Sequence, residues 1–166
     1  MYRNIKDFTS DWEQETKMTL KIFSALTEES LLKKVHPDVR TLGRLAWHIT
    51  QTLTEMTSKA GLLTEDELED TPIPVAVTEL IANYQKYANR VSEEVNRQWT
   101  DSELEQRVNM YGQEWRKGTV LSVLVNHQIH HRAQMTIIMR LAGLKVPGIY
   151  GPAKEEWAAW GMTAHE

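Results

Sequence analysis

Residues 119–142 read TVLSVLVNHQIHHRAQMTIIMRLA, an apolar run long enough to predict a single helix. With Val120 at the origin of a helical wheel, one core stripe falls within roughly 60° and contains Leu124, His127, His131, Met135, Ile138 and Ala142. His127 and His131 are four residues apart, so their side chains lie on one face about one turn from each other. Because a buried imidazole needs a partner, the pair predicts either a shared metal ion or two separate hydrogen bonds.

The other histidines divide by position. His130 lies about 80° from the centre of the stripe, so it is expected to support a ligand or to face the solvent. His36 precedes Pro37 in a predicted connection and is expected to be exposed, and His165, beside the C-terminus, is expected to be disordered. A catalytic metal site usually has three protein ligands and a water, so the pair needs a third ligand from elsewhere.

A second helix is predicted over residues 41–60, with Thr41 as its N-cap and Gly61 as its C-terminal stop. Its core stripe contains Leu42, Leu45, Ala46, Ile49, Leu53 and Met56. His48 lies at one edge of that stripe, in line with Thr52 and Glu55. Such a residue faces either a pocket between helices or water.

Two further helices are predicted over residues 4–26 and 75–98. In the first, Glu15 is among the charged residues expected to be solvated. Residues 27–40 form a connection, 61–74 with Pro72 and Pro74 form a long crossover, and 103–107 suggest a short hairpin. A short helix is expected at 154–160. Four long helices with long connections predict an all-α four-helix bundle of the crossover type, as one domain over residues 1–166.

Composition excludes several classes of function. The net charge is −4 and there is no Lys/Arg block, so nucleic-acid binding is not supported. No apolar run reaches the roughly 18 residues of a membrane span, and residues 1–15 contain no hydrophobic core of a signal peptide. The chain has no cysteine, so any reacting thiol must belong to a substrate. A cytoplasmic protein is expected.

Three segments resemble the DinB/YfiT-like family of metal-binding four-helix bundles. They are LGRLAWHI at residues 42–49, the pattern His127-x3-His131-Arg132-x-Gln134, and VPGIYGP at residues 146–152. The order of the helices extends the resemblance over nearly the whole chain. The resemblance implies an up-down-down-up bundle that holds a divalent metal ion, nickel or zinc in type, through His48, His127 and His131. It also implies that His130 is a neighbour and not a ligand.

The family resemblance implies three possible activities. Some members conjugate low-molecular-weight thiols to small molecules, some isomerise such adducts, and others are metal-dependent hydrolases. A metal ion with an open position suits a thiol S-transferase, which we favour, or a hydrolase, because it lowers the pKa of a bound thiol or water. The alternatives are a non-catalytic bundle that binds a metal or small ligand, and a structural bundle whose histidines only form hydrogen bonds.

Several neighbouring residues have two interpretations. Glu55, seven residues beyond His48, is a candidate general base or a solvated helix residue. Gln134 is expected to orient a ligand, whereas Arg132 is expected to pair on the surface. Four aromatic residues line a pocket or belong to the core: Trp47, Tyr84, Trp115 and Tyr150.

The helix over residues 119–142 has a second apolar strip, formed by Val125, Ile129 and Ala133, on the side opposite the histidines. A helix that is apolar on two sides is either central or covered by a partner. The strip therefore predicts a homodimer.

Overall fold

The computed structural model describes residues 1–164. Four long helices form its body, namely α1 (Ile5–Phe23), α3 (Leu42–Lys59), α4 (Val77–Gln98) and α5 (Lys117–Leu141). The shorter elements are α2 (Glu28–Leu32), the 3-10 helices η1 (Asp101–Glu105) and η2 (Lys154–Trp160), and the strands β1 (Arg107–Met110) and β2 (Gln113–Arg116). The all-α bundle expected from the sequence is confirmed.

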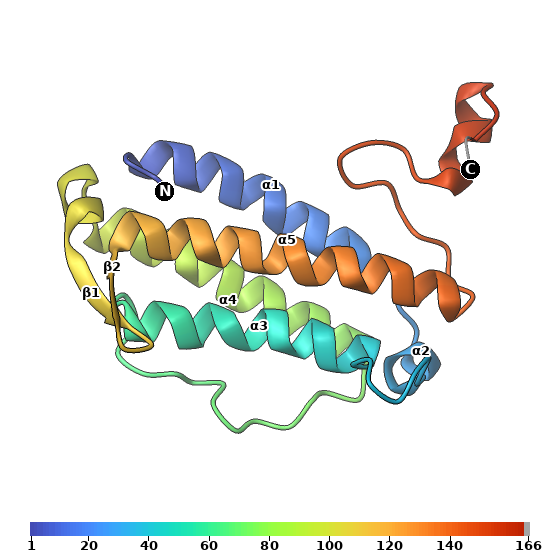
Figure 1. The fold of residues 1–166 in the computed structure, drawn as a ribbon, viewed down its shortest axis with the longest axis horizontal. Coiled ribbons are helices and arrows are strands. Elements are labelled where there is room, and N and C mark those ends of the chain that lie inside the picture. Colours follow the sequence, from blue (N-terminus) through green and yellow to red (C-terminus); the bar gives the residue numbers. More distant parts are fainter. Residues whose placement is uncertain (165–166) are drawn as a thin grey trace.

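The direction of the helices follows from the long connection between α3 and α4. Residues 60–76 return along the length of the bundle, so that α3 and α4 run in the same direction (Figure 1). Helices α1 and α5 run the opposite way, which gives the up-down-down-up order. Helix α3 packs against both α4 and α5, and α1 packs against the same two helices. The α3–α5 pair is therefore antiparallel, and its facing surfaces carry the histidines.

Local sequence signals account for the ends of the main helices. The side chains of Asn4 and Thr41 accept hydrogen bonds from the backbone N–H groups three residues later, at 2.8 and 3.2 Å, and so cap α1 and α3. Gly61 and Gly143 follow α3 and α5 with φ values of 74° and 81°, a left-handed conformation that glycine adopts without strain. The predicted start and stop of the second helix are confirmed.

Two connections differ from the sequence-based expectation. Residues 27–40 contain the short helix α2, which a capping box between Thr27 and Ser30 initiates. The hairpin lies at residues 107–116 and not at 103–107, because residues 101–105 form η1. Tyr111 and Gly112 both have positive φ values, as the two central residues of a tight type I′ hairpin turn do. The predicted helix at 154–160 is present as η2.

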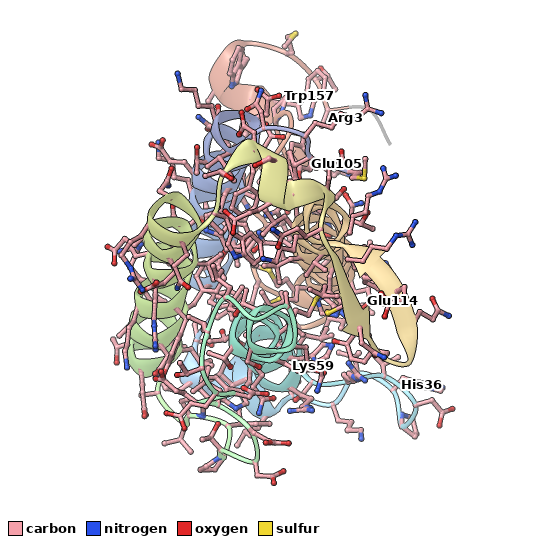
Figure 2. All side chains as sticks on the ribbon, turned by 90° about the vertical axis from the view of Figure 1, so that its left-hand side faces the viewer. Arg3, His36, Lys59, Glu105, Glu114 and Trp157 are labelled. Carbon is pink, nitrogen blue, oxygen red and sulfur yellow. The ribbon has the colours of Figure 1, made fainter. Side chains whose placement is uncertain are left out.

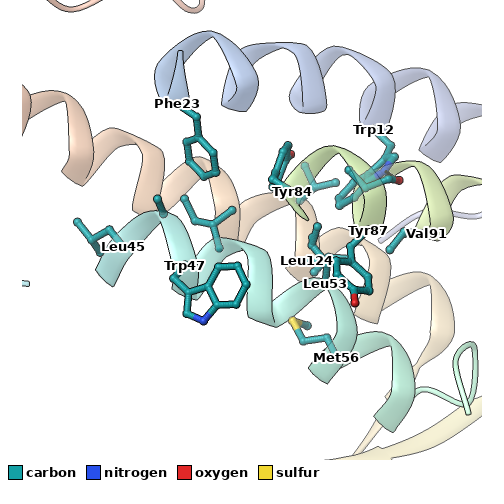
Figure 3. Packing of buried hydrophobic residues seen from close by; sticks show 14 of the residues in the cluster. Trp12, Phe23, Leu45, Trp47, Leu53, Met56, Tyr84, Tyr87, Val91 and Leu124 are labelled. Atoms are coloured by element: carbon teal, nitrogen blue, oxygen red, sulfur yellow. Dashed lines mark hydrogen bonds between the residues drawn. The ribbon is translucent and has the colours of Figure 1, made fainter. Parts of the chain in front are cut away.

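The core lies between the four long helices, and aromatic side chains fill much of it (Figure 3). The rings of Phe23 and Tyr84 meet edge to face with centroids 5.2 Å apart, and the buried Leu53 and Leu124 belong to the same core cluster. Trp47 is buried, and its indole N–H donates to the backbone carbonyl of Thr71 at 3.2 Å, which ties the crossover to α3. Trp47 and Tyr84 are therefore core residues. No helix within residues 1–164 has the length and apolarity needed to cross a membrane.

A buried ion pair joins α5 to α1. The guanidinium of Arg132 is buried, and it donates to the carboxylate and the backbone carbonyl of Glu15 and to the hydroxyl of Thr19. Tyr150 from the C-terminal segment accepts from Arg132 at 2.6 Å and donates to Glu15 at 2.8 Å. The sequence-based placement of Arg132 and Glu15 on the surface is wrong. The physical reason is that α5 has two neighbours, so a second face of the helix, turned toward α1, is also buried.

We expect Arg132→Met to lower the free energy of unfolding by about 3–5 kcal/mol, because it leaves the Glu15 carboxylate buried without its cation. Urea denaturation measures this change. The matched control is Arg140→Met, since Arg140 pairs with Glu155 at the surface, and its loss should cost within about 1 kcal/mol. Equal effects of the two substitutions would show that the buried pair has no special role in stability.

Candidate metal centre

Three histidines converge between α3 and α5. His48 comes from α3, and His127 and His131 come from successive turns of α5. Their ring centroids are 4.8, 4.7 and 4.4 Å apart for the pairs 48–127, 48–131 and 127–131. One nitrogen atom from each ring lies within 4.8 Å of those of the other two. The spacing of the α5 pair is a property of a single helix, whereas His48 reaches the pair through antiparallel packing of two helices.

Hydrogen bonds at the outer edges of the rings set the tautomers of the α5 pair. Nδ1 of His131 lies 2.8 Å from Oε1 of Gln134, so this nitrogen carries the proton and donates it. Nδ1 of His127 faces the Thr52 hydroxyl in a longer contact of 3.5 Å. That hydroxyl already donates its proton to the carbonyl of Ile49 at 2.8 Å, so it can only accept. Both Nε2 atoms are therefore left with free lone pairs.

The two Nε2 atoms of His127 and His131 face each other at 3.1 Å. Two lone pairs at this distance repel each other unless a proton or a cation lies between them or beside them. A shared proton would make one of the rings cationic, which burial disfavours, whereas a metal ion accepts both lone pairs and leaves both outer hydrogen bonds intact. The donor set thus fits a divalent metal ion.

Burial keeps the three imidazoles neutral. Desolvation lowers the pKa of His48 to about 4, and electrostatic coupling to His127, His131, Arg40 and Arg44 lowers it further. Desolvation also lowers the pKa of His127 to about 4, and neighbouring histidines and Arg40 add to the shift. The pKa of His131 is lowered as well, mainly by burial, although its hydrogen bond to Gln134 opposes the shift. Neutral imidazole is the form that binds metal ions.

The remaining histidines lie outside this group. His130 is exposed, and its Nε2 accepts from the amide of Gln134 at 3.0 Å, so one glutamine links it to His131. His36 is exposed, as expected, and its Nδ1 accepts from the backbone N–H of Asp38 at 3.2 Å. His165 lies outside the described residues.

Glu55 lies near His48 but not among the three rings. It lines a small polar cleft of about 290 Å³ together with His48, Arg44 and Gln51. One carboxylate oxygen of Glu55 accepts a hydrogen bond of 3.1 Å from the Tyr111 hydroxyl at the hairpin turn. Its role as a general base stays a prediction.

A larger cleft of about 790 Å³ opens beside His131 and Gln134. Its other walls come from the connection before α3 and from the exposed side of α5, and they contain Val35, His36, Asp38, Val39, Arg40, Leu45, Ile137, Ile138 and Leu141. Sequence analysis missed this cleft, because no periodic signal places residues 35–40 against α5. The aromatic residues Trp115 and Tyr150, considered above as pocket residues, do not line it.

The fold and the histidine group define a crossover four-helix bundle with a candidate metal centre in its interior. The sequence matches the DinB family over residues 1–162. The chain belongs to the DinB family, as the three motifs suggested.

Two further comparisons cover almost the whole chain. The chain is 42% identical to the uncharacterized protein YrdA of Bacillus subtilis (strain 168), over 99% of this chain and 98% of YrdA. It is similar to the crystal structure of a DinB-like protein from Bacillus cereus ATCC 10987, with a TM-score of 0.84 and 39% identity, over 90% of this chain and 100% of the other. A second DinB-like structure, YjoA of Bacillus subtilis, has a TM-score of 0.70 at 14% identity over 89% and 99% of the two chains, and shows the fold alone.

We expect His127→Ala to lose stoichiometric zinc, because two imidazoles alone rarely make a tight site. Metal analysis and calorimetric titration of protein purified without a His-tag measure the loss. His130→Ala is the matched control, since it removes a neighbouring imidazole from the same helix and should retain zinc. Retention of zinc by the His127 variant would refute the three-histidine site.

We also expect Gln134→Leu to weaken zinc binding about 10–100-fold, because it removes the acceptor that orients the His131 ring. Gln85→Leu serves as the control, since the Gln85 side chain donates to Asn89 at 2.8 Å on the surface of α4, away from the histidines. Unchanged zinc affinity in the Gln134 variant would show that the His131 ring is oriented by packing alone.

Proposed function

We propose that this DinB family member is a metal-dependent enzyme that acts on a small molecule, with transfer of a low-molecular-weight thiol to an electrophile as the favoured reaction. One observation supports the proposal most directly. The nitrogens of His48, His127 and His131 converge within 4.8 Å beside a cleft of about 790 Å³. No Asp or Glu within residues 1–164 joins this group, so the protein offers three ligands and leaves room for a substrate.

The residues of the chain have separate tasks in this proposal. His48, His127 and His131 would hold a divalent ion, zinc or nickel in type. When bound, such an ion lowers the pKa of a thiol or a water that reaches its open position. Gln134 and Thr52 hold the outer nitrogens of the α5 rings, so that both Nε2 atoms stay directed to the same point. The apolar walls of the larger cleft exclude water from the reacting groups.

Thiol transfer is favoured over hydrolysis by the surroundings of the three rings. A hydrolase gains from a carboxylate that takes a proton from water, but Glu55 is engaged by Tyr111 two helical turns from His48. Thiol transfer needs no such base. The thiol proton passes to solvent, the sulfur forms a bond to the electrophilic carbon, and the bond from that carbon to its leaving group, such as chloride, breaks. The chain has no cysteine, so the thiol comes from a substrate. The cytoplasm, where such thiols stay reduced, is the setting that suits this reaction.

Two alternatives remain as distinct outcomes of one experiment. Zinc- and nickel-loaded protein is mixed with cysteine and 1-chloro-2,4-dinitrobenzene, or with p-nitrophenyl acetate alone, and turnover is followed by absorbance. We expect thioether formation that is lost on chelation and in His127→Ala but kept in Glu55→Gln. Ester cleavage that falls in Glu55→Gln would instead identify a hydrolase. Metal binding without turnover of either substrate class would favour a non-catalytic binding bundle.

A homodimer is part of the proposal, but less of the second apolar strip on α5 is exposed than the sequence analysis expected. Val125 is buried and Ile129 packs partly against the core, so the chain itself covers most of that strip. The apolar surface that stays open on α5 is formed by Ile137 and Leu141, which are 61% and 64% exposed. Light scattering of a monomer at micromolar concentration would remove the homodimer from the proposal.

A further inference from the structure

We propose that the larger cleft binds a small molecule with an apolar body and an anionic group of the carboxylate or phosphate type, and that Arg40 binds the anion. This inference rests on the proposed function, since it names the class of substrate that would reach the three histidines. It is argued from three features of the cleft: its apolar walls, the unpaired guanidinium at its edge, and the position of that charge relative to the imidazoles.

The walls of the cleft are mostly apolar on both sides. Val35 and Val39 contribute one wall from the connection before α3, and Ile137, Ile138 and Leu141 contribute the other from α5. Large apolar side chains such as Leu141 are exposed here. A concave surface lined by exposed apolar side chains usually marks a binding site. The cleft volume of about 790 Å³ suits a small organic molecule. The walls therefore select a ligand with an apolar body.

Arg40 is the cation of this cleft without a partner. Within residues 1–164 its exposed side chain makes neither an ion pair nor a hydrogen bond. The acidic residue of the same cleft, Asp38, is turned to the ring of His36 at 3.7 Å, and its side chain is 90% exposed. Arg44, four residues further along and inside α3, differs in that it donates to Gln51 at 3.0 Å and lines the smaller cleft instead. The larger cleft thus keeps one guanidinium to which no side chain within residues 1–164 is bound.

The charge of Arg40 acts on the whole metal centre. Burial is the main cause of the lowered pKa of His48, His127 and His131, and Arg40 adds a smaller lowering to each, so it lies within electrostatic reach of the three rings. His131 and Arg40 line the same cleft. A ligand whose carboxylate or phosphate is held by the planar fork of Arg40 therefore has its body between the apolar walls and its far end beside His131. Arg40 would position the substrate and take no part in bond making.

The test uses metal-free protein, so that an anion cannot bind to a metal ion. Octanoate, octyl phosphate and octanol are titrated by calorimetry against the full chain after treatment with EDTA. We expect the tighter of the two anions to bind about tenfold more strongly than octanol, as one charged hydrogen-bonding contact provides. The order of octanoate and octyl phosphate identifies the anionic group.

Matched variants assign the effect. Arg40→Gln should abolish the tenfold preference and leave octanol binding unchanged, and Arg40→Lys should keep part of it because the charge remains. Arg3→Gln removes an equal charge far from the cleft, because Arg3 and the cleft residue His36 lie at opposite ends of the molecule (Figure 2). It should leave the affinities for all three ligands unchanged. Leu141→Ser should weaken all three ligands, since it removes an apolar wall.

Three results would overturn the inference. The first is equal binding of the anions and octanol to the unsubstituted protein, and the second is an equal effect of Arg40→Gln and Arg3→Gln. The third is a dimer in light scattering that octanoate does not dissociate, which would mean that a second copy of the chain covers the cleft. Because the titrations need no metal and no turnover, they can fail while the proposed enzyme activity holds, and can succeed while that activity is absent.

Discussion

Two imidazole nitrogens that face each other at 3.1 Å on one helix are the constraint from which the site is built. Each ring donates through its outer nitrogen or faces an acceptor there, so the inner lone pairs of His127 and His131 have no proton between them. His48 adds a third neutral ring from α3. Repulsion among such groups disfavours the arrangement unless a cation is bound, so the three rings could hold a metal ion.

The buried ion pair on the other side of α5 complements this arrangement. His131 and Arg132 are consecutive, so their side chains point about 100° apart. His131 is turned toward His48 on α3, and Arg132 is turned toward Glu15 on α1. Rotation of α5 about its axis would break both contacts at once. The ion pair, with the Tyr150 hydroxyl closing it from the C-terminal segment, thereby fixes the direction in which the histidines point.

The two clefts that flank the histidines differ in chemistry. The small cleft beside His48 is polar and is lined by several carboxylates, including that of Glu55. The large cleft beside His131 is mostly apolar, and Arg40 is one of its lining residues. A shared fold does not decide what such a site binds. The 14% identical YjoA structure illustrates this, since it supports the bundle but says nothing of these side chains.

The four long helices, the caps at Thr41 and Gly61, and the pairing of His127 with His131 follow from the sequence alone, because each depends on residues that are close together in the chain. Its three motifs were also sufficient to indicate the DinB family. The other features of the site depend on packing between distant segments of the chain. His48 is 79 residues from His127 in the chain. The sequence predicts Arg132 at the surface, whereas packing of α5 against α1 buries it. Arg40 joined the site because the loop before α3 lies against α5, and such contacts between distant segments leave no periodic trace in the sequence.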